Sequence, residues 1–155
     1  MEQKLRIESI NSKINLNKLP SKLKNLNTSS LGGMISEFIH YVFKERIKSK
    51  SLNWCFTNIK RVKIFLQIFH ADQGKKEIYK EEIAKQLPEY SYKTIAKIID
   101  DGLAKKYFIL MGVDGASGSD GKVKNIRPSE ELMVDFLNLS LEIASYIEKK
   151  KLSQD

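Results

Sequence analysis

Residues 78–102 read IYKEEIAKQLPEYSYKTIAKIIDDG, and this stretch decides the fold. Its second half begins at Ser91, whose hydroxyl can accept a hydrogen bond from a free N–H of the first helical turn. Isoleucines at helical spacing then predict one buried face: Ile95, Ile98 and Ile99. Gly102 suits the left-handed residue that ends a helix. The stretch therefore predicts a short helix, a tight turn and a second helix over residues 91–101.

The outer face of this second helix carries groups that can hold and read a DNA duplex. No acidic residue lies between Ser91 and Ile99. Lysine can bind phosphate or guanine, a hydroxyl can donate or accept, and a small methyl can contact thymine. The candidate DNA-binding residues on this helix are Ser91, Tyr92, Lys93, Thr94, Ala96 and Lys97. The alternative is a solvated amphipathic helix without a ligand.

A hairpin is expected after this helix pair. Residues 107–113 (YFILMGV) have strand-forming content, and residues 114–121 (DGASGSDG) form a turn-rich tip. Residues 122–127 (KVKNIR) then resemble a second strand, so the hairpin forms a wing over residues 112–127. Its cations are candidate contacts to the DNA backbone: Lys122, Lys124 and Arg127. A plain surface hairpin is the alternative.

Together these motifs resemble winged helix-turn-helix regulators of the MarR family, over about residues 54–151. The segments that carry the resemblance are IAKQL (83–87), SYKT (91–94), IIDDGL (98–103), DGK (120–122) and PSE (128–130). The resemblance implies a homodimer that binds an inverted repeat in double-stranded DNA. It further implies a transcriptional repressor in preference to an activator, with a small-molecule effector of unknown identity as one option. Where the family has a wing arginine, this chain has Lys122, which cannot form a bidentate fork.

Long helices on either side of the winged domain are expected to form the dimer. The C-terminal helix, capped by Ser129, carries two apolar stripes that are together too broad for one contact. A partner subunit would cover the second stripe. A helix sandwiched within one subunit is the alternative. The expected dimer contacts are Ile35, Phe38, Ile39, Val42, Phe136, Leu137, Leu141, Ile143, Ala144 and Ile147.

The chain is expected to divide into four segments. These are a basic N-terminal extension or strap (1–30), an N-terminal dimerisation helix and connection (31–53), the winged helix-turn-helix domain (54–128), and a C-terminal dimerisation helix and tail (129–155). Residues 1–30 are either an arm that orders on DNA or a strap on the partner subunit, and their regular leucines and isoleucines favour the strap. A single helix over residues 52–71 should open the winged domain, and residues 76–79 should add a very short strand. The predicted fold class is mainly α (α+β), with a two- to three-stranded wing sheet.

Composition favours a polyanionic partner. The 155-residue chain has a net charge of +8 and a pI of about 9.4. Its arginines are few (Arg6, Arg46, Arg61 and Arg127), which favours backbone electrostatics over bidentate reading of bases. Two alternatives to a regulator are a winged-helix protein-interaction module with an acidic partner and a sequence-indifferent architectural DNA-binding protein. Salt dependence and preference for one site would separate the three.

Catalysis has little support in the sequence. The two histidines and the single Cys55 show no metal-ligand spacing, and the paired acids are adjacent, so they diverge on a helix. We therefore expect no enzyme activity, no catalytic residue, no metal and no cofactor. Cys55 lies in an apolar WCF triplet that indicates core, with a redox switch as the alternative. No apolar run reaches the ~20 residues that span a bilayer and no secretory signal is evident, so we expect no membrane partner and a cytoplasmic location.

Overall fold

The computed structural model describes residues 2–13, 28–112 and 124–152. The chain divides into two compact units, Met1–Ile39 and His40–Asp155, at a boundary that the sequence did not indicate. The first unit contains helix α1 (Glu2–Lys13) and most of helix α2 (Thr28–Glu45). The second unit contains the end of α2 and all later elements, and it holds the predicted DNA-binding segment.

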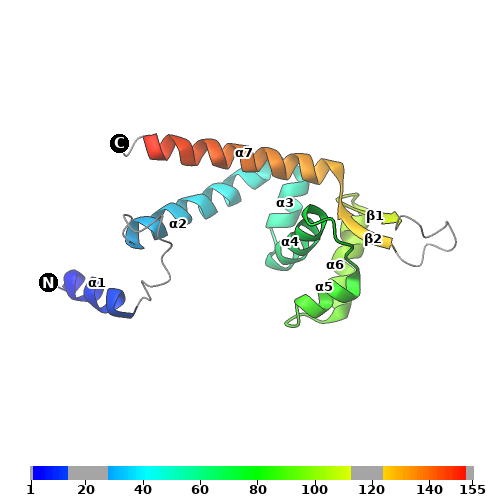
Figure 1. Ribbon diagram of the computed structural model, residues 1–155, viewed down its shortest axis with the longest axis horizontal. Coiled ribbons are helices and arrows are strands. Elements are labelled where there is room, and N and C mark those ends of the chain that lie inside the picture. Colours follow the sequence, from blue (N-terminus) through cyan, green and yellow to red (C-terminus); the bar gives the residue numbers. More distant parts are fainter. Residues whose placement is uncertain (1, 14–27, 113–123, 153–155) are drawn as a thin grey trace. The chain divides into compact units, whose positions relative to one another are not determined.

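The second unit is mainly helical and carries one small sheet (Figure 1). After α2 its elements are η3 (Arg46–Lys48), α3 (Lys50–Phe56), α4 (Ile59–Gln73), α5 (Lys80–Gln86), α6 (Tyr92–Ala104), β1 (Phe108–Gly112), β2 (Lys124–Pro128) and α7 (Glu130–Leu152). Strands β1 and β2 pair antiparallel, with Phe108 opposite Pro128 and Gly112 opposite Lys124. This confirms the expectation of a mainly α fold with a small sheet.

The helix expected over residues 52–71 is two helices, so that prediction was wrong. Helix α3 ends at Phe56, and α4 begins at Ile59. Between them, the side chain of Asn58 accepts a hydrogen bond from the Lys60 N–H at 2.8 Å and caps α4. An asparagine cap satisfies a free amide of the first turn, so the chain can start a new helix in a new direction at this point.

Aromatic rings fill the core between α4 and α7. Phe65 is fully buried, and its ring meets the ring of Phe136 edge to face with centroids 5.1 Å apart. Phe69 meets the same Phe136 ring at 4.9 Å. Edge-to-face pairs of this kind add about 0.5–1.5 kcal/mol beyond the burial of their area. Phe136 therefore fixes α7 against α4.

Gly102 lies inside α6 and does not end it, which corrects the predicted boundary at residue 101. The helix continues to Ala104, and Lys106 takes the left-handed conformation beyond it, with φ of 63°. A Cβ on Gly102 would lie 2.4 Å from Cδ2 of Phe108 and 3.1 Å from the Trp54 ring. The missing side chain makes room for the buried Phe108 ring, so the glycine serves packing and not termination.

Residues 76–79 do not form the expected strand, but Ile78 is joined to β2 by two hydrogen bonds. The Ile126 N–H donates to the Ile78 carbonyl at 3.0 Å, and the Ile78 N–H donates to Oδ1 of Asn125 at 2.9 Å. Asn125 is buried. Its side-chain oxygen takes the place of a backbone carbonyl, so the segment is attached to the hairpin without a continuous ladder.

The start of α7 is fixed by capping and by contacts to α3. The Leu132 N–H donates to the hydroxyl of the buried Ser129 at 3.1 Å, which confirms the predicted cap. One turn later, Oδ2 of Asp135 accepts hydrogen bonds from the hydroxyls of Ser49 and Ser51, both at 2.7 Å. Since Ser49 also caps α3, this cluster ties the first turn of α3 to α7.

Candidate nucleic-acid interface

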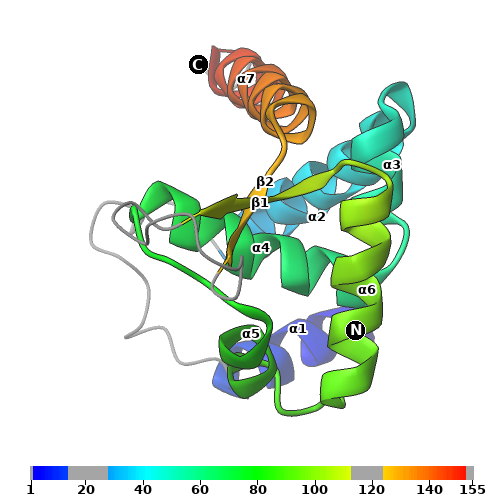
Figure 2. The ribbon, with the colours of Figure 1, turned by 90° about the vertical axis from the view of Figure 1, so that its right-hand side faces the viewer.

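The first turn of α6 is fixed by its own cap. The Thr94 N–H donates to the hydroxyl of Ser91 at 3.2 Å, and the two hydroxyls lie 2.9 Å apart. Ile95 and Ile99 are fully buried, as the sequence predicted for the inner face. Helix α6 contacts α5, α4 and β1 (Figure 2). The outer face of α6 is therefore held in a defined orientation.

The predicted outer-face residues are brought together on one side of α6. Ser91, Tyr92, Lys93 and Lys97 are exposed, while Thr94 and Ala96 are half-buried. Lys93 and Lys97 are one helical turn apart, at about 6 Å along the axis. Within the described parts of the chain, neither ammonium group has an ion-pair or hydrogen-bond partner, so both remain free to bind an external anion.

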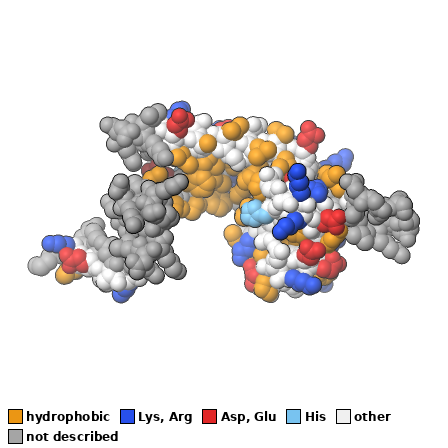
Figure 3. Space-filling model, viewed as in Figure 1, with side chains coloured by type: hydrophobic (Ala, Val, Ile, Leu, Met, Phe, Trp, Pro, Cys, Tyr) orange, Lys and Arg blue, Asp and Glu red, His pale blue; other side chains and the backbone are white. Residues whose placement is uncertain are grey.

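The acidic side chains near this face are already engaged. Glu81 accepts a hydrogen bond from the Tyr92 hydroxyl at 3.3 Å, and Asp100 pairs with the Lys80 ammonium at 2.6 Å. Figure 3 shows acidic and basic side chains interspersed on the visible surface around α5. The Lys80–Asp100 pair is neutral and Glu81 keeps its negative charge beside Tyr92, whereas Lys93 and Lys97 have no acidic partner among the described residues.

Two lysines of α4 form a second basic cluster at the turn before α6. The ammonium groups of Lys60 and Lys63 lie 5.5 and 5.4 Å from the centre of the Tyr90 ring. Lys63 also pairs with Glu89 at 2.9 Å. The backbone of Glu89 and then Lys63 lower the pKa of the Glu89 carboxyl. The sequence signal was KRVK at residues 60–63, which places two lysines on one helical face beside the turn.

Arg127, a predicted contact to the DNA backbone, forms an ion pair within the fold. Its Nη1 lies 2.6 Å from Oδ1 of Asp72 at the end of α4, and both side chains are about three-quarters buried. The ion pair joins β2 to α4 and occupies the guanidinium. Lys122 lies outside the described residues, as does the side chain of Lys124, although Lys124 begins β2.

The other arginines of the second unit also hold the fold. Arg46 donates from Nη1 to the Phe56 carbonyl at 3.1 Å. Arg61 donates from Nη1 to the Trp54 carbonyl at 3.2 Å and lies over the Trp54 ring at 4.8 Å. Both therefore satisfy carbonyls of α3, close to where that helix ends. The cations that face outward from α6 are accordingly lysines.

Three of the predicted dimer contacts pack inside the chain itself, and the others are exposed. Val42 is buried, and Phe136 and Ile143 are half-buried against the core of the second unit, because the aromatic and aliphatic groups of that core cover them. The exposed predicted contacts are Ile35, Phe38 and Ile39 of the first unit and Leu137, Leu141, Ala144 and Ile147 of α7. Val134, which the prediction omitted, is also exposed on α7.

Metal sites and membrane-spanning helices are not found among the residues that the structure describes. These residues contain no group of three or more His, Cys, Asp or Glu side chains placed to hold a metal ion. None of the described helices combines the length and apolar character needed to cross a membrane. No protein-family model, curated protein or solved structure matches the chain.

Proposed function

We propose that the chain is a winged helix-turn-helix protein that binds double-stranded DNA as a homodimer and regulates transcription. In this proposal α5 and α6 form the helix-turn-helix, and the β1–β2 hairpin with Ile78 forms the wing sheet. The observation that carries the proposal is the outer face of α6, where Lys93 and Lys97 are exposed and unpaired within the described chain while Glu81 and Asp100 beside them are engaged. Such a face is complementary to a polyanion.

The outer face of α6 would enter the major groove, which is about 12 Å wide and admits one helix. Lys93 and Lys97 would bind phosphates or guanine edges, and the Tyr92 hydroxyl would exchange Glu81 for a phosphate or base. The free amides of the first α6 turn would favour a phosphate near Ser91. A net charge of +8 would speed the approach to DNA through long-range attraction.

An apolar stripe on α7 supports the homodimer. Val134, Leu137, Leu141 and Ala144 follow one another at spacings of three and four residues, and all four are exposed. This is the spacing with which two helices pack along a common seam. Two subunits joined there would present two copies of α6, and helices that read an inverted repeat lie about 34 Å apart, one DNA turn. A repressor role, a small-molecule effector and a cytoplasmic location remain expectations within this proposal.

One observation favours an architectural DNA-binding protein as a second candidate. Arg46, Arg61 and Arg127 are all engaged inside the fold, so the described outer face of α6 would contact DNA through lysines. Lysine is a point charge without the planar fork that reads guanine. A protein of this kind would bind the phosphate backbone with little preference for sequence.

Selection of bound sequences from a random duplex pool at about 150 mM salt would separate the candidates, if the mass of the complex is measured in parallel. An enriched inverted repeat with two subunits bound is the result expected for a dimeric regulator. Retention without enrichment would support the architectural protein. No retention at any salt concentration would contradict DNA binding and direct attention to an acidic protein partner.

A double substitution tests the face itself. Lys93→Ala with Lys97→Ala should weaken DNA binding and lower the magnitude of its salt slope by about 0.9 for each phosphate that the protein no longer neutralises. The control is Lys76→Ala with Lys105→Ala, which removes the same charge from exposed positions before α5 and after α6. An equal fall in affinity in the two double variants would show that net charge, and not this face, determines binding.

A further inference from the structure

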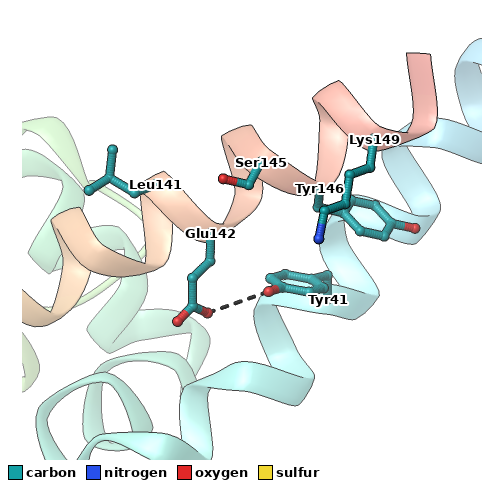
Figure 4. Close-up of a pocket in the computed structure, with 6 residues that line it drawn as sticks. All are labelled: Tyr41, Leu141, Glu142, Ser145, Tyr146 and Lys149. Carbon is teal, nitrogen blue, oxygen red and sulfur yellow. Dashed lines mark hydrogen bonds between the residues drawn. The ribbon is translucent and has the colours of Figure 1, made fainter. Parts of the chain in front are cut away.

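An open pocket of about 460 Å³ lies between the end of α2 and the second half of α7, within the second unit (Figure 4). Tyr41 is contributed by α2. The remaining lining residues come from two and a half turns of α7: Leu141, Glu142, Ser145, Tyr146 and Lys149. None of these residues belongs to α6 or the hairpin, so the pocket is separate from the proposed DNA-binding face.

Two stacked tyrosine rings form one wall of this pocket. The rings of Tyr41 and Tyr146 are stacked, with centroids 5.2 Å apart and an angle of 24° between their planes. Leu141 also lines the pocket, but it belongs to the proposed α7 seam, so the ligand contacts expected here are those to the tyrosines and to the charged groups. A planar ring placed here would gain stacking on the tyrosine pair, and it would remove apolar surface from water at about 25 cal/mol per Å².

Opposite charges lie at the two ends of the wall. Glu142 accepts a hydrogen bond from the Tyr41 hydroxyl at 3.4 Å, which keeps its carboxylate beside the ring. Burial, and then the charge of Glu142, raise the pKa of the Tyr41 hydroxyl, so it remains a donor. Lys149 follows Glu142 by seven residues, about 10.5 Å along the helix axis, and no described acid pairs with it.

This arrangement discriminates between ligands by their charge. A ligand with only an anionic group would be attracted by Lys149 and repelled by Glu142, and a ligand with only a cationic group would meet the reverse. A net-neutral ligand with one group of each sign would be attracted at both ends. The Ser145 hydroxyl lies between the two charges along α7 and can donate or accept.

We propose that this pocket binds a planar aromatic zwitterion, with its ammonium group at Glu142, its ring on the Tyr41–Tyr146 wall and its carboxylate at Lys149. The proposal does not depend on DNA binding. A suitable probe is 4-(aminomethyl)benzoate, which carries both charges across one ring. Benzoate and benzylamine each carry one of its two charges and serve as matched comparison ligands.

NMR titration of the full chain tests the proposal through the amide resonances of residues 141–149. The zwitterion should shift these resonances at lower concentration than benzoate or benzylamine. Glu142→Gln keeps an acceptor for Tyr41. It should weaken the binding of the zwitterion and of benzylamine, but not the binding of benzoate. Lys149→Gln should weaken the binding of the zwitterion and of benzoate, but not the binding of benzylamine. Since both charges are solvent-exposed, each decrease in affinity should be about two- to fivefold.

The controls are Glu148→Gln and Lys44→Gln, which remove single charges from exposed residues of α7 and α2 outside the pocket lining. Both should bind the zwitterion like the unmodified chain. The proposal is overturned if the probe shifts none of these resonances, as would happen if a second copy filled the pocket. It is also overturned if the two pocket variants bind the zwitterion as tightly as the controls do.

Discussion

Gly102 is the residue at which the absence of a side chain determines how α6, β1 and α3 pack. A methyl group there would overlap the Phe108 ring and approach the Trp54 ring. Both rings are buried and lie edge to face, with centroids 5.6 Å apart. Neither ring can move without disturbing the other, so the close approach cannot be relieved by a flexible chain end.

We predict that Gly102→Ala destabilises the fold by about 1–3 kcal/mol, although alanine favours helices, because the added methyl overfills this site. Gly33→Ala is the matched control, since a Cβ at Gly33 in α2 meets no atom within 4 Å. That control should leave stability unchanged or raise it by up to about 1 kcal/mol. Urea unfolding measures the free energy of unfolding of both variants. Equal values for Gly102→Ala and Gly33→Ala would refute the packing role of Gly102.

Cys55 is the second residue whose surroundings decide its chemistry. Its side chain is fully buried, and burial raises the pKa of the thiol to about 12. A thiol that stays protonated is a poor nucleophile. The structure therefore favours the core interpretation of Cys55 over the redox alternative.

The pKa of Cys55 also predicts a pH dependence. Because the folded-state pKa is raised above that of the unfolded chain, the stabilising effect is complete below about pH 9 and is lost as the pH rises toward 12. This residue alone should lower the free energy of unfolding by roughly 1.3 kcal/mol between pH 8 and pH 10. Denaturant unfolding of the chain and of Cys55→Ala at both values measures the effect. The same pH-dependent decrease in the alanine variant would exclude Cys55 as its source.

At the scale of the elements, the ion pair between Arg127 and Asp72 joins strand β2 to the end of α4. We predict that Arg127→Gln lowers the free energy of unfolding by about 1–2 kcal/mol, between the values typical of exposed and fully buried pairs. DNA affinity and its salt slope should not change, because the guanidinium is already bound to Asp72. A fall in affinity without a fall in stability would restore the phosphate-binding role expected from the sequence.

The helices that the sequence predicted well are those with strong local signals. Ser91 and Ser129 cap α6 and α7 as expected, and Ile95 and Ile99 face inward. The break before α4 was missed because Trp54 and the later aromatic residues continue the apolar pattern across it. Only the asparagine at position 58 marked the break, and a single capping residue is a weak signal within an apolar run.

Local sequence patterns did not predict the contacts between segments distant in sequence. The partner of Gly102 is Phe108 across a turn, and the partner of Arg127 is Asp72, which lies 55 residues earlier. Local periodicity contains no information on such pairs, so the glycine was interpreted as a terminator and the ion pair of the arginine was not predicted. The contacts of Lys60 and Lys63 with the Tyr90 ring were not predicted for the same reason.

At the scale of the whole molecule, the exposed stripe on α7 predicts self-association. Leu137→Glu with Leu141→Glu should convert a dimer into a monomer, because four carboxylates would meet at a symmetric seam. Gln73→Glu with Gln86→Glu adds the same charge at exposed positions of other helices and should leave the dimer intact. Sedimentation velocity measures the mass of the unmodified chain and of both double variants. A monomeric unmodified chain would contradict the predicted dimer, and a leucine double variant that stays dimeric would contradict the α7 stripe as its interface.

The separate use of arginine and lysine in the second unit has a chemical consequence. Arg46, Arg61 and Arg127 are bound to carbonyls or to a carboxylate, whereas Lys93 and Lys97 are exposed. Acetylation acts on lysine amines and leaves guanidinium groups intact. It would therefore remove positive charge from the outer face of α6 without breaking the arginine contacts that hold the helices together. An acyl group could in this way neutralise the lysine face of this protein while its architecture persists.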